Sequence, residues 1–415
     1  MNSWIDIPKN SDFSIYNLPF GIFSSNKNSK RVGVAIGNNI IDLLACNELD
    51  IFKDLNINNN VFENNFLNDF INLGKNKTNK VREIIQQQLT DESSKIKMSS
   101  VVIIPMNEAE MHLPVKVGDY TDFYSSIEHA TNIGSMFRDP SNPLLPNWRH
   151  LPVGYHGRAS SIIVSGTDIF RPKGQVMPLD SDKPVFTPSK RIDFELEMGY
   201  IIGKNSSLGS SITTDDADNY IFGKVLFNDW SARDIQKWEY VPLGPFLGKS
   251  FASSISPWIV TLDALEPFRV PGEKQEPAVL PYLEFEGNKN IDINLEVLIS
   301  SENFDSHTIS KSNYKYMYWN MTQQLAHHTI NGCNINAGDM MASGTISGNA
   351  PEAYGSMLEL SWKGTKPIPM PDNSERKFLQ DNDCLIMRAH CQAKQYRIGF
   401  GEVKTKILPA KELNL

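Results

Sequence analysis

The sequence has few cysteines, no long hydrophobic run and no excess of basic residues. Its cysteines number four in 415 residues, and their positions show no pairing pattern. We therefore expect free thiols and a reducing compartment, which indicates a cytoplasmic protein. The longest aliphatic runs, such as 101–104, are too short to span a bilayer. Residues 1–10 lack the basic and apolar segments of a signal peptide.

The charge balance and the composition narrow the class of protein. Acidic residues number 48 against 40 basic ones, which gives a net charge of −8. An acidic surface is poorly suited to binding nucleic acid phosphates. Hydrophobic residues make up 40% of the chain, an ordinary globular value. We expect a soluble globular protein that acts on a small molecule and has neither nucleic acid nor membrane as a partner.

Composition divides the chain into two regions. Residues 1–114 are rich in asparagine, most densely at 56–79, whereas residues 115–415 are rich in glycine, proline and aromatic residues. We predict a boundary near Pro114, with a small β-rich N-terminal domain (1–114) and a larger catalytic domain (115–415). In the first region, 31–37 and 40–43 flank an Asn38-Asn39 turn and indicate a β-hairpin.

Hydrophobic periodicity predicts few helices and several strands. The 3.6-residue spacing of apolar residues predicts helices at 81–89 and 320–330, with a shorter one at 122–134. Residues 221–227 indicate a buried strand, and 290–300 alternate as a strand does. Because no βαβ rhythm repeats, we expect a mixed, strand-dominated second region rather than a doubly wound sheet.

The stretch 194–198 alternates apolar and acidic side chains. On a strand, Phe194, Leu196 and Met198 would share one face, and Glu195 and Glu197 the other. Two neighbouring carboxylates repel each other, and a bound cation would relieve both that repulsion and the cost of burial. The alternative is a solvated strand face on which acidic residues are common.

A third carboxylate, Asp229, follows the apolar strand predicted at 221–227. The end of a buried strand is a frequent position for an active-site acid. Alternatively, Asp229 or Ser231 caps the helix that follows.

The short helix predicted at 122–134 carries a further pair of polar residues. Asp122 and His129 lie seven residues apart, about two helical turns, and would share a face. The alternatives are an N-cap role for Asp122 and an ordinary surface or core position for His129. The candidate metal ligands are all oxygen donors, without a zinc or EF-hand spacing, and hard carboxylates favour Mg²⁺, Ca²⁺ or Mn²⁺.

Several uninterrupted motifs, spread over essentially the whole chain, resemble the fumarylacetoacetase (fumarylacetoacetate hydrolase) family. In the first region the motif is Phe13-Ser-Ile-Tyr-Asn-Leu-Pro-Phe-Gly-Ile-Phe. The others are Asp119-Tyr-Thr-Asp122-Phe-Tyr124-Ser-Ser, His129-Ala-Thr-Asn, Met136-Phe-Arg138-Asp, Leu151-Pro-Val-Gly-Tyr155-His-Gly-Arg158-Ala-Ser, Asn228-Asp229-Trp-Ser-Ala-Arg233-Asp-Ile-Gln236-Lys-Trp-Glu-Tyr240 and Val241-Pro-Leu-Gly-Pro-Phe-Leu-Gly-Lys249-Ser.

The resemblance implies a fold, a reaction and an assembly. The fold would be mainly β, mixed with some α, with a small N-terminal SH3-like β-domain and a C-terminal β-sandwich roll that binds the metal. The reaction would be hydrolysis of the carbon–carbon bond of 4-fumarylacetoacetate to fumarate and acetoacetate, the last step of tyrosine and phenylalanine degradation. The assembly would be a homodimer.

The resemblance also implies roles for individual residues. A Ca²⁺ or Mg²⁺ ion would be held by Asp122, Glu195, Glu197 and Asp229. A further cation position would lie near Asp229, Lys249 and Ser253, where Ser253 stands in place of the family's usual threonine. His129 would be the general base, oriented by Glu359. Arg233, Gln236 and Lys249 would stabilise the oxyanion. The substrate would contact Tyr124, Arg138, Tyr155, Gln236, Tyr240 and Thr345, of which Thr345 is also a glycine-flanked turn residue.

Two other functions stay open. A related hydrolase or decarboxylase of smaller 2-oxo acids, such as an acylpyruvase, would share the Glu-x-Glu and Asp pattern, but such relatives are usually shorter. An inactive metal-binding scaffold would also keep the carboxylates. The joint presence of His129, Glu359, Arg233, Gln236 and Lys249 favours an active enzyme.

Overall fold

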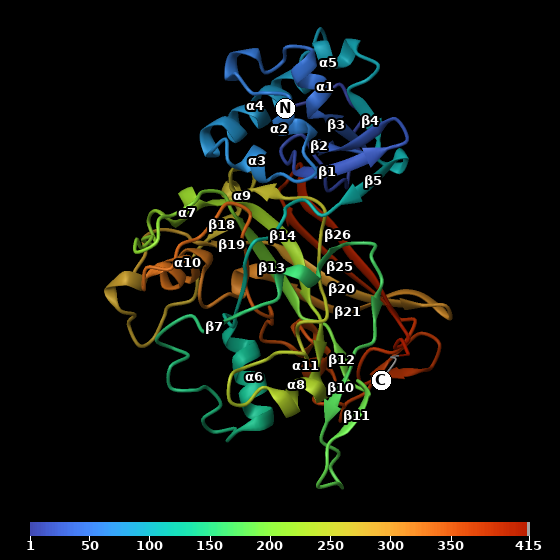
Figure 1. Ribbon diagram of the computed structural model, residues 1–415, viewed down its shortest axis with the longest axis vertical. Coiled ribbons are helices and arrows are strands. Elements are labelled where there is room, and N and C mark those ends of the chain that lie inside the picture. The colour runs from blue at the N-terminus through green and yellow to red at the C-terminus, as the bar shows by residue number, and fades with distance from the viewer. Residues whose placement is uncertain (413–415) are drawn as a thin grey trace.

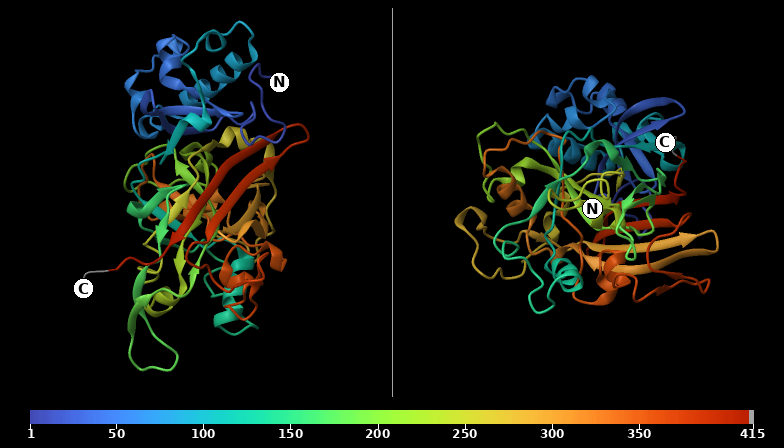
Figure 2. Two further views of the ribbon diagram at one scale, coloured as in Figure 1. Left: turned by 90° about the vertical axis from the view of Figure 1, so that its right-hand side faces the viewer. Right: turned by 60° about the horizontal axis from the view of Figure 1, so that its bottom comes forward.

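Strands form most of the regular structure, so the predicted mainly β class is confirmed (Figure 1). The structure is a computed structural model that describes residues 1–412. The elements of the first region gather at one end of the molecule, and the longer strands of the second region fill its middle (Figures 1 and 2). Among residues 1–412, none of the helices combines the length and apolar character that a bilayer crossing requires.

The first region contains an antiparallel sheet in the order β4-β3-β2-β1-β5. The predicted hairpin is confirmed, because β2 pairs with β3, but its turn falls at Gly37-Asn38, one residue before the predicted Asn38-Asn39. The strands are β1 (Phe20–Ser25), β2 (Asn28–Ile36), β3 (Asn39–Asp42), β4 (Ile103–Pro105) and β5 (Ala109–His112).

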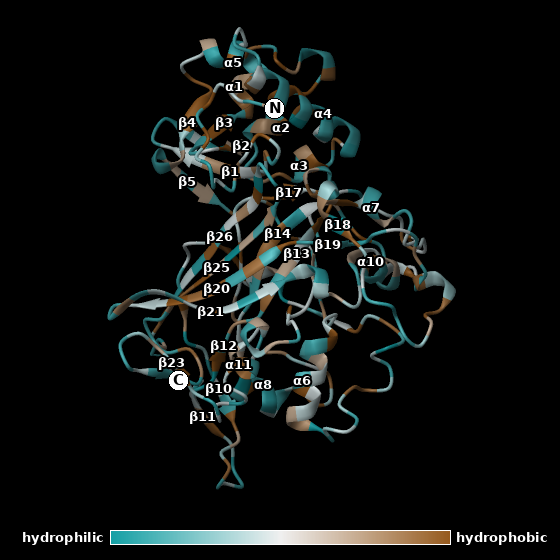
Figure 3. Ribbon diagram, turned by 180° about the vertical axis from the view of Figure 1, so that it is seen from behind, coloured by the Kyte–Doolittle hydropathy of each residue, from teal (hydrophilic) through white to brown (hydrophobic). Residues whose placement is uncertain are grey.

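This region is more helical than its sequence indicates. The helix predicted at 81–89 is confirmed and begins earlier, at Lys75; it buries Val81, Ile85 and Leu89 and turns a hydrophilic side outward (Figure 3). The short helices are set by tertiary packing rather than by a long periodic pattern. The helices are α1 (Leu43–Glu48), α2 (Asn60–Glu63), α3 (Asn68–Ile71), α4 (Lys75–Thr90) and α5 (Lys95–Met98).

The second region is built on a mixed sheet in the order β7-β6-β22-β13-β14-β16-β8, with β17 also paired to β14. Every residue of β13 and β14 is buried. The predicted strand at 221–227 is therefore confirmed, and it runs on to Asp229. The strands are β6 (Tyr120–Phe123), β7 (Gly154–His156), β8 (Ile162–Val164), β13 (Leu196–Ile202), β14 (Ile221–Asp229), β16 (Ser253–Ile255), β17 (Val260–Thr261) and β22 (Met340–Ala342).

A second sheet, in the order β21-β20-β25-β26-β9, lies against the first. Its strands are β9 (Ile169–Phe170), β20 (Asn294–Ser301), β21 (Phe304–Asn313), β25 (Cys384–Gln392) and β26 (Arg397–Leu408). Short two-stranded ribbons complete the region, and they are formed by β10 (Lys173–Val176) with β11 (Val185–Pro188), β12 (Ile192–Asp193) with β15 (Ser231–Ala232), β18 (Arg269–Val270) with β19 (Asn290–Ile291) and β23 (Ile368–Pro369) with β24 (Glu375–Arg376).

The helices of the second region are short and lie around the sheets. The helix predicted at 320–330 is confirmed as α10, which begins with a capping box formed by Asn320 and Gln323. The helices are α6 (Ile127–Phe137), α7 (Ala217–Tyr220), α8 (Arg233–Glu239), α9 (Leu262–Leu265), α10 (Met321–Thr329) and α11 (Met357–Leu360). All four cysteines are free, as expected.

The helix predicted from residue 122 is partly wrong. Asp122 lies on β6, where it pairs with Ala342 of β22, and the helix begins only after Ser126. Ser126 caps it by accepting the N–H of His129. Asp122 and His129 therefore do not share a helix face, and Asp122 caps no helix. The parallel pairing with β22, more than 200 residues away, overrides the local apolar spacing.

Lys224 is a fully buried lysine in the middle of β14. Its ammonium donates to Tyr314 Oη (2.8 Å) and lies 4.2 Å and 5.3 Å from the ring centroids of Tyr314 and Tyr200. Burial lowers the pKa of Lys224 to about 7. Between that value and the ordinary lysine pKa, the unfolded chain holds a proton that the folded protein lacks, so stability rises with pH.

Replacing Lys224 with methionine is therefore expected to remove a pH-dependent loss of folding stability. Lys224→Met should gain stability over the unmodified protein most strongly at pH 7 and below. That advantage should shrink by roughly 2 kcal/mol by pH 9. Urea unfolding of both proteins at the two pH values measures the change. If the stability advantage of Lys224→Met were the same at both pH values, the titrating group would not be Lys224.

Candidate active site

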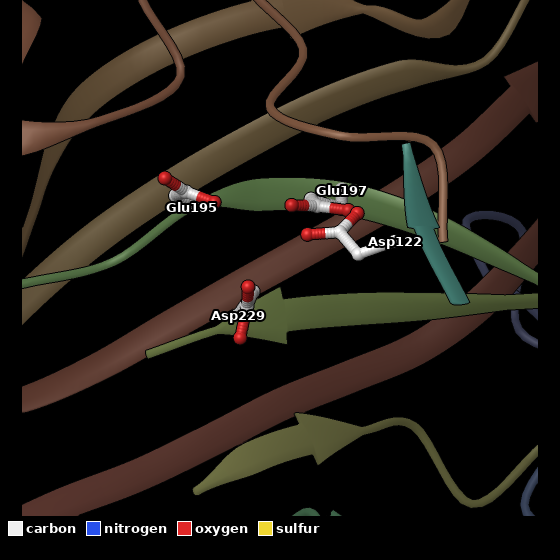
Figure 4. A group of neighbouring side chains, drawn as sticks. All are labelled: Asp122, Glu195, Glu197 and Asp229. Atoms are coloured by element: carbon white, nitrogen blue, oxygen red, sulfur yellow. The ribbon is translucent and has the colours of Figure 1, made fainter. Parts of the chain in front are cut away.

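Four buried carboxylates converge between neighbouring strands of the mixed sheet (Figure 4). Asp122 comes from β6, Glu197 from β13 and Asp229 from the last position of β14, and Glu195 lies just before β13 begins. One oxygen from each can be chosen so that all four lie within 4.8 Å of one another. The strands thus gather residues that lie more than 100 positions apart in the sequence.

Alternation along the strand explains why both glutamates point into this group. Phe194, Leu196 and Met198 are fully buried in the apolar core on one side. Glu195 and Glu197 therefore face the other side, where they are only 6% and 0% exposed. The alternative of a solvated strand face is wrong.

Two of the carboxylates lack partners for one oxygen each. Asp122 Oδ1 and Glu197 Oε1 are buried and accept no hydrogen bond in the described residues. Burial and the neighbouring carboxylates raise the pKa of both groups well above the ordinary range. Unpaired buried oxygens of this kind are what a cation would satisfy. The donor set, all carboxylate oxygen, fits a hard divalent ion such as Ca²⁺ or Mg²⁺.

Two cationic side chains hold the other carboxylates. Lys249 Nζ lies 2.6 Å from Glu195 Oε2 and 2.8 Å from Asp229 Oδ2, and Arg233 Nη1 lies 2.8 Å from Glu195 Oε1. Burial alone would raise the pKa of Glu195, but Lys249 and Arg233 outweigh it and lower that pKa. With the four carboxylates and the two cationic side chains all ionised, these six groups carry a net charge of −2, which a divalent cation would balance; Asp193, which also pairs with Arg233, lies outside this count.

Asp229 accepts hydrogen bonds at both of its carboxylate oxygens. Tyr155 Oη donates to its Oδ2 (2.9 Å), and Ser253 Oγ donates to its Oδ1 (3.2 Å). The alternative of a helix cap is wrong, because α8 has Ala232 at its N-cap and no side chain caps it. The structure therefore brings Tyr155, Lys249 and Ser253 together around one metal-ligand candidate.

His129 and Glu359 form a buried pair on the helices α6 and α11. His129 Nδ1 lies 2.7 Å from Glu359 Oε2, and the two side chains are 4% and 0% exposed. Burial acts to raise the pKa of Glu359, but His129 and further hydrogen bonds outweigh it and lower that pKa. Glu359 is thus held as a carboxylate, which fixes the ring of His129 with Nδ1 toward it and Nε2 away from it.

Three residues around Glu359 escaped the sequence reasoning. Ser347 Oγ lies 2.9 Å from Oε1, Ser356 Oγ donates to Oε2 (2.8 Å), and Asn132 Nδ2 donates to Oε1 (2.9 Å). Ser356 also accepts the N–H of Glu359 at the start of α11. The spacing Ser-x-x-Glu is the sequence signature of such a cap, so the sequence itself indicates Ser356. Nothing in the sequence indicates Ser347.

The predicted substrate-binding residues fall into two groups. Tyr124 lies edge-on to His129, with ring centroids 5.3 Å apart, and Gln236 Oε1 accepts from Arg233 Nη1 (3.3 Å). Thr345 is buried beside Gly344, whose N–H donates to Glu197 Oε2 (2.9 Å). By contrast, Tyr240 is half exposed at the end of α8, and the guanidinium of Arg138 donates to the carbonyl of Pro143.

Gly344 has a backbone that requires glycine. Its φ of +77° is left-handed, and a Cβ there would lie 2.2 Å from the carbonyl oxygen of Phe123. Gly344 is thus packed against the end of β6, the strand that carries Asp122, while its N–H donates to Glu197.

A buried carboxylate group that fits a divalent metal, close to charged donors and accompanied by a buried histidine–glutamate pair, defines the site of a hydrolytic enzyme. Residues 16–114 match the family described as fumarylacetoacetase N-terminal, and residues 120–408 match the one described as fumarylacetoacetate hydrolase C-terminal. The chain belongs to the fumarylacetoacetase family.

Individual relatives match over nearly the full chain. The fumarylacetoacetase of Homo sapiens is 52% identical over 414 residues, which cover 98% of this chain and 99% of the relative. That of Dictyostelium discoideum is 50% identical over 420 residues, with 99% and 98% covered. A solved fumarylacetoacetate hydrolase from Exiguobacterium antarcticum is only 17% identical, with a TM-score of 0.54 over 95% of this chain and 100% of that one, and supports the fold alone.

Proposed function

We propose that this protein hydrolyses the carbon–carbon bond of 4-fumarylacetoacetate to fumarate and acetoacetate, the last step of tyrosine and phenylalanine degradation. The observation that carries the proposal is the buried His129–Glu359 pair together with the carboxylate cluster of β6, β13 and β14. Relatives about 50% identical over nearly the full chain carry the name fumarylacetoacetase, which fits this reaction.

In the proposed reaction His129 acts as the general base. Glu359 occupies Nδ1, so Nε2 is the nitrogen that takes a proton from the attacking water. Glu359 then stabilises the imidazolium. The serines and Asn132 around Glu359 keep its carboxylate in place while the charge on His129 changes.

Arg233, Gln236 and Lys249 are the donors proposed to stabilise the negative charge of the tetrahedral species. Arg233 Nη2 is buried and has no partner among residues 1–412, so it is free to donate to substrate oxygen. Asp229 and Glu195 outweigh burial and raise the pKa of Lys249, which keeps its ammonium charged. A divalent cation, when bound, would supply Lewis-acid stabilisation of the diketone oxygens.

Asp122, Glu195, Glu197 and Asp229 would hold that cation, which we propose to be Ca²⁺ or Mg²⁺. The second cation position near Asp229, Lys249 and Ser253 stays a prediction. Lys249 itself already brings a positive charge to that place, since its ammonium contacts two of the carboxylates.

Substrate contacts are proposed for residues on both sides of the cluster. Tyr124 lies beside His129, Thr345 follows Gly344, whose N–H donates to Glu197, and Tyr155 would act from its position on Asp229. Arg138 and Tyr240, which are more exposed, would reach the substrate's carboxylates after side-chain rearrangement. A guanidinium suits a carboxylate because it donates two parallel hydrogen bonds.

We also propose a cytoplasmic homodimer, with a domain boundary near Pro114. The segment from Trp238 to Leu247 exposes large apolar side chains, among them Leu243 at 97%, and such a surface suits burial against a second copy. The free cysteines fit a reducing cytoplasm. Sedimentation velocity would report the mass, which for a single chain is 46.8 kDa.

The test of the proposed function is an assay with purified protein. Fumarylacetoacetate should be consumed, turnover should stop after treatment with a chelator, and added Ca²⁺ or Mg²⁺ should restore it. Acetylpyruvate, the substrate class of a smaller-acid hydrolase, should react far more slowly. Faster turnover of acetylpyruvate would favour the acylpyruvase alternative, and no turnover of either compound would favour a scaffold.

A further inference from the structure

Asp193 is a fully buried carboxylate next to the site but outside the group of metal-ligand candidates. It lies on β12, two residues before Glu195. Its Oδ2 lies 2.7 Å from Arg233 Nε, and it also accepts the backbone N–H groups of Met357 (2.6 Å, to Oδ1) and Leu358 (3.1 Å, to Oδ2). One side chain thus joins β12 to the starts of α8 and α11.

The contact with Arg233 determines how its guanidinium is turned. With Nε held by Asp193, Nη1 reaches Glu195 Oε1 at 2.8 Å, and Nη2 is left buried without a partner in the described part of the chain. Without the charge of Asp193, the guanidinium would be free to turn and place two N–H groups on Glu195, the preferred fork geometry for a carboxylate. The free donor would then be lost, and Glu195 would be more strongly neutralised.

The contacts with Met357 and Leu358 act on the other half of the site. The first N–H groups of a helix have no partner within that helix, and Asp193 satisfies two of them at the start of α11. The same single turn carries Glu359, whose carboxylate orients His129. Asp193 therefore fixes the backbone that positions the histidine–glutamate pair.

We propose that Asp193 is a positioning residue that ties Arg233 and the carboxylate cluster to the His129–Glu359 pair. Its expected effect on kcat rests on the proposed hydrolysis of fumarylacetoacetate. In Asp193→Asn the side-chain amide keeps the size of the carboxylate but loses its charge and places an N–H donor among other donors. Arg233 and α11 then lose their common anchor.

The test compares Asp193→Asn with Asp234→Asn as a matched control. Asp234 lies on the same helix as Arg233, but its carboxylate accepts from Ser189 Oγ (2.5 Å) and the Lys190 N–H (2.7 Å), away from the cluster. For Asp193→Asn we expect kcat to fall about 10²-fold with KM changed less than about threefold. Asp234→Asn should keep kcat within about threefold while losing thermal stability to a similar extent.

A calcium titration by calorimetry gives a second measurement that needs no substrate. Because Arg233 would compete with the cation for Glu195, the Kd for Ca²⁺ should rise about 10-fold in Asp193→Asn and stay unchanged in Asp234→Asn. If Asp193→Asn does not fold, Asp193→Ser, which keeps an acceptor for the Met357 N–H, takes its place. Equal changes in kcat and in Kd for the two variants would overturn the proposal. An unmodified protein without turnover would instead overturn the proposed function, and the Ca²⁺ result would still decide the role of Asp193.

Discussion

His129→Ala is expected to lower kcat for fumarylacetoacetate on the order of 10⁴-fold, because the proposed reaction then lacks its general base. The four carboxylates of the cluster keep their hydrogen-bond partners after this change, since among residues 1–412 the side chain of His129 is bonded to Glu359 and to none of the metal-ligand candidates. Ca²⁺ affinity should therefore stay within about threefold of the unmodified value. Steady-state kinetics and a calcium titration on the same preparation measure the two effects.

Two further variants make the result specific. Glu359→Gln should lower kcat by a smaller factor, about 10²-fold, because His129 stays in place but loses the carboxylate that stabilises its charged form. His327→Ala is the matched control: this histidine bonds Tyr282 Oη at 3.0 Å and belongs to α10, so kcat should hardly change. Near-normal turnover of His129→Ala would show that another group accepts the proton.

The strands that carry the carboxylates are the feature that the sequence predicts best. Alternation of apolar and acidic side chains at 194–198 predicts that Glu195 and Glu197 share a face, and the apolar run before Asp229 predicts a buried strand. The first follows from the two-residue period of a strand and the second from a continuous apolar run, and both are local properties of the sequence. The structure has these features, with Glu197 and Asp229 on neighbouring strands β13 and β14.

Long-range contacts explain what the sequence could not supply. Asp122 joins the cluster through parallel pairing of β6 with β22, so its local helical spacing misleads. His129 and Glu359 are 230 residues apart, and their pairing entered only through the family resemblance. Asp193 escaped notice because its partners, Arg233 and the N–H groups of α11, are each distant in sequence and recognisable only in space.

Glu197→Gln is expected to have opposite effects on the metal-free and the metal-bound protein. In the metal-free protein, burial and neighbouring carboxylates raise the pKa of Glu197, whose Oε1 has no hydrogen-bond partner within residues 1–412. A group with a raised pKa contributes stability below its unfolded pKa and loses it as pH rises, so the glutamate costs stability at neutral pH. The amide removes that cost, and the variant should gain roughly 1–3 kcal/mol at pH 7 and almost nothing near pH 4.

With Ca²⁺ present, the unmodified protein should be more stable than Glu197→Gln. At 100 times its Kd the ion stabilises the unmodified protein by about 2.7 kcal/mol, whereas Glu197→Gln has lost a charged ligand and should gain little. Turnover should fall about 10³-fold, since the site no longer carries the net −2 charge that matches the ion. Thermal unfolding with and without Ca²⁺ measures whether the substitution raises or lowers stability in each state. Glu402→Gln is the matched control, because Glu402 pairs with Arg388 and both side chains are exposed. If Glu197→Gln lost stability without Ca²⁺ and kept its response to the ion, Glu197 would be a structural hydrogen-bond acceptor for Gly344 rather than a metal ligand.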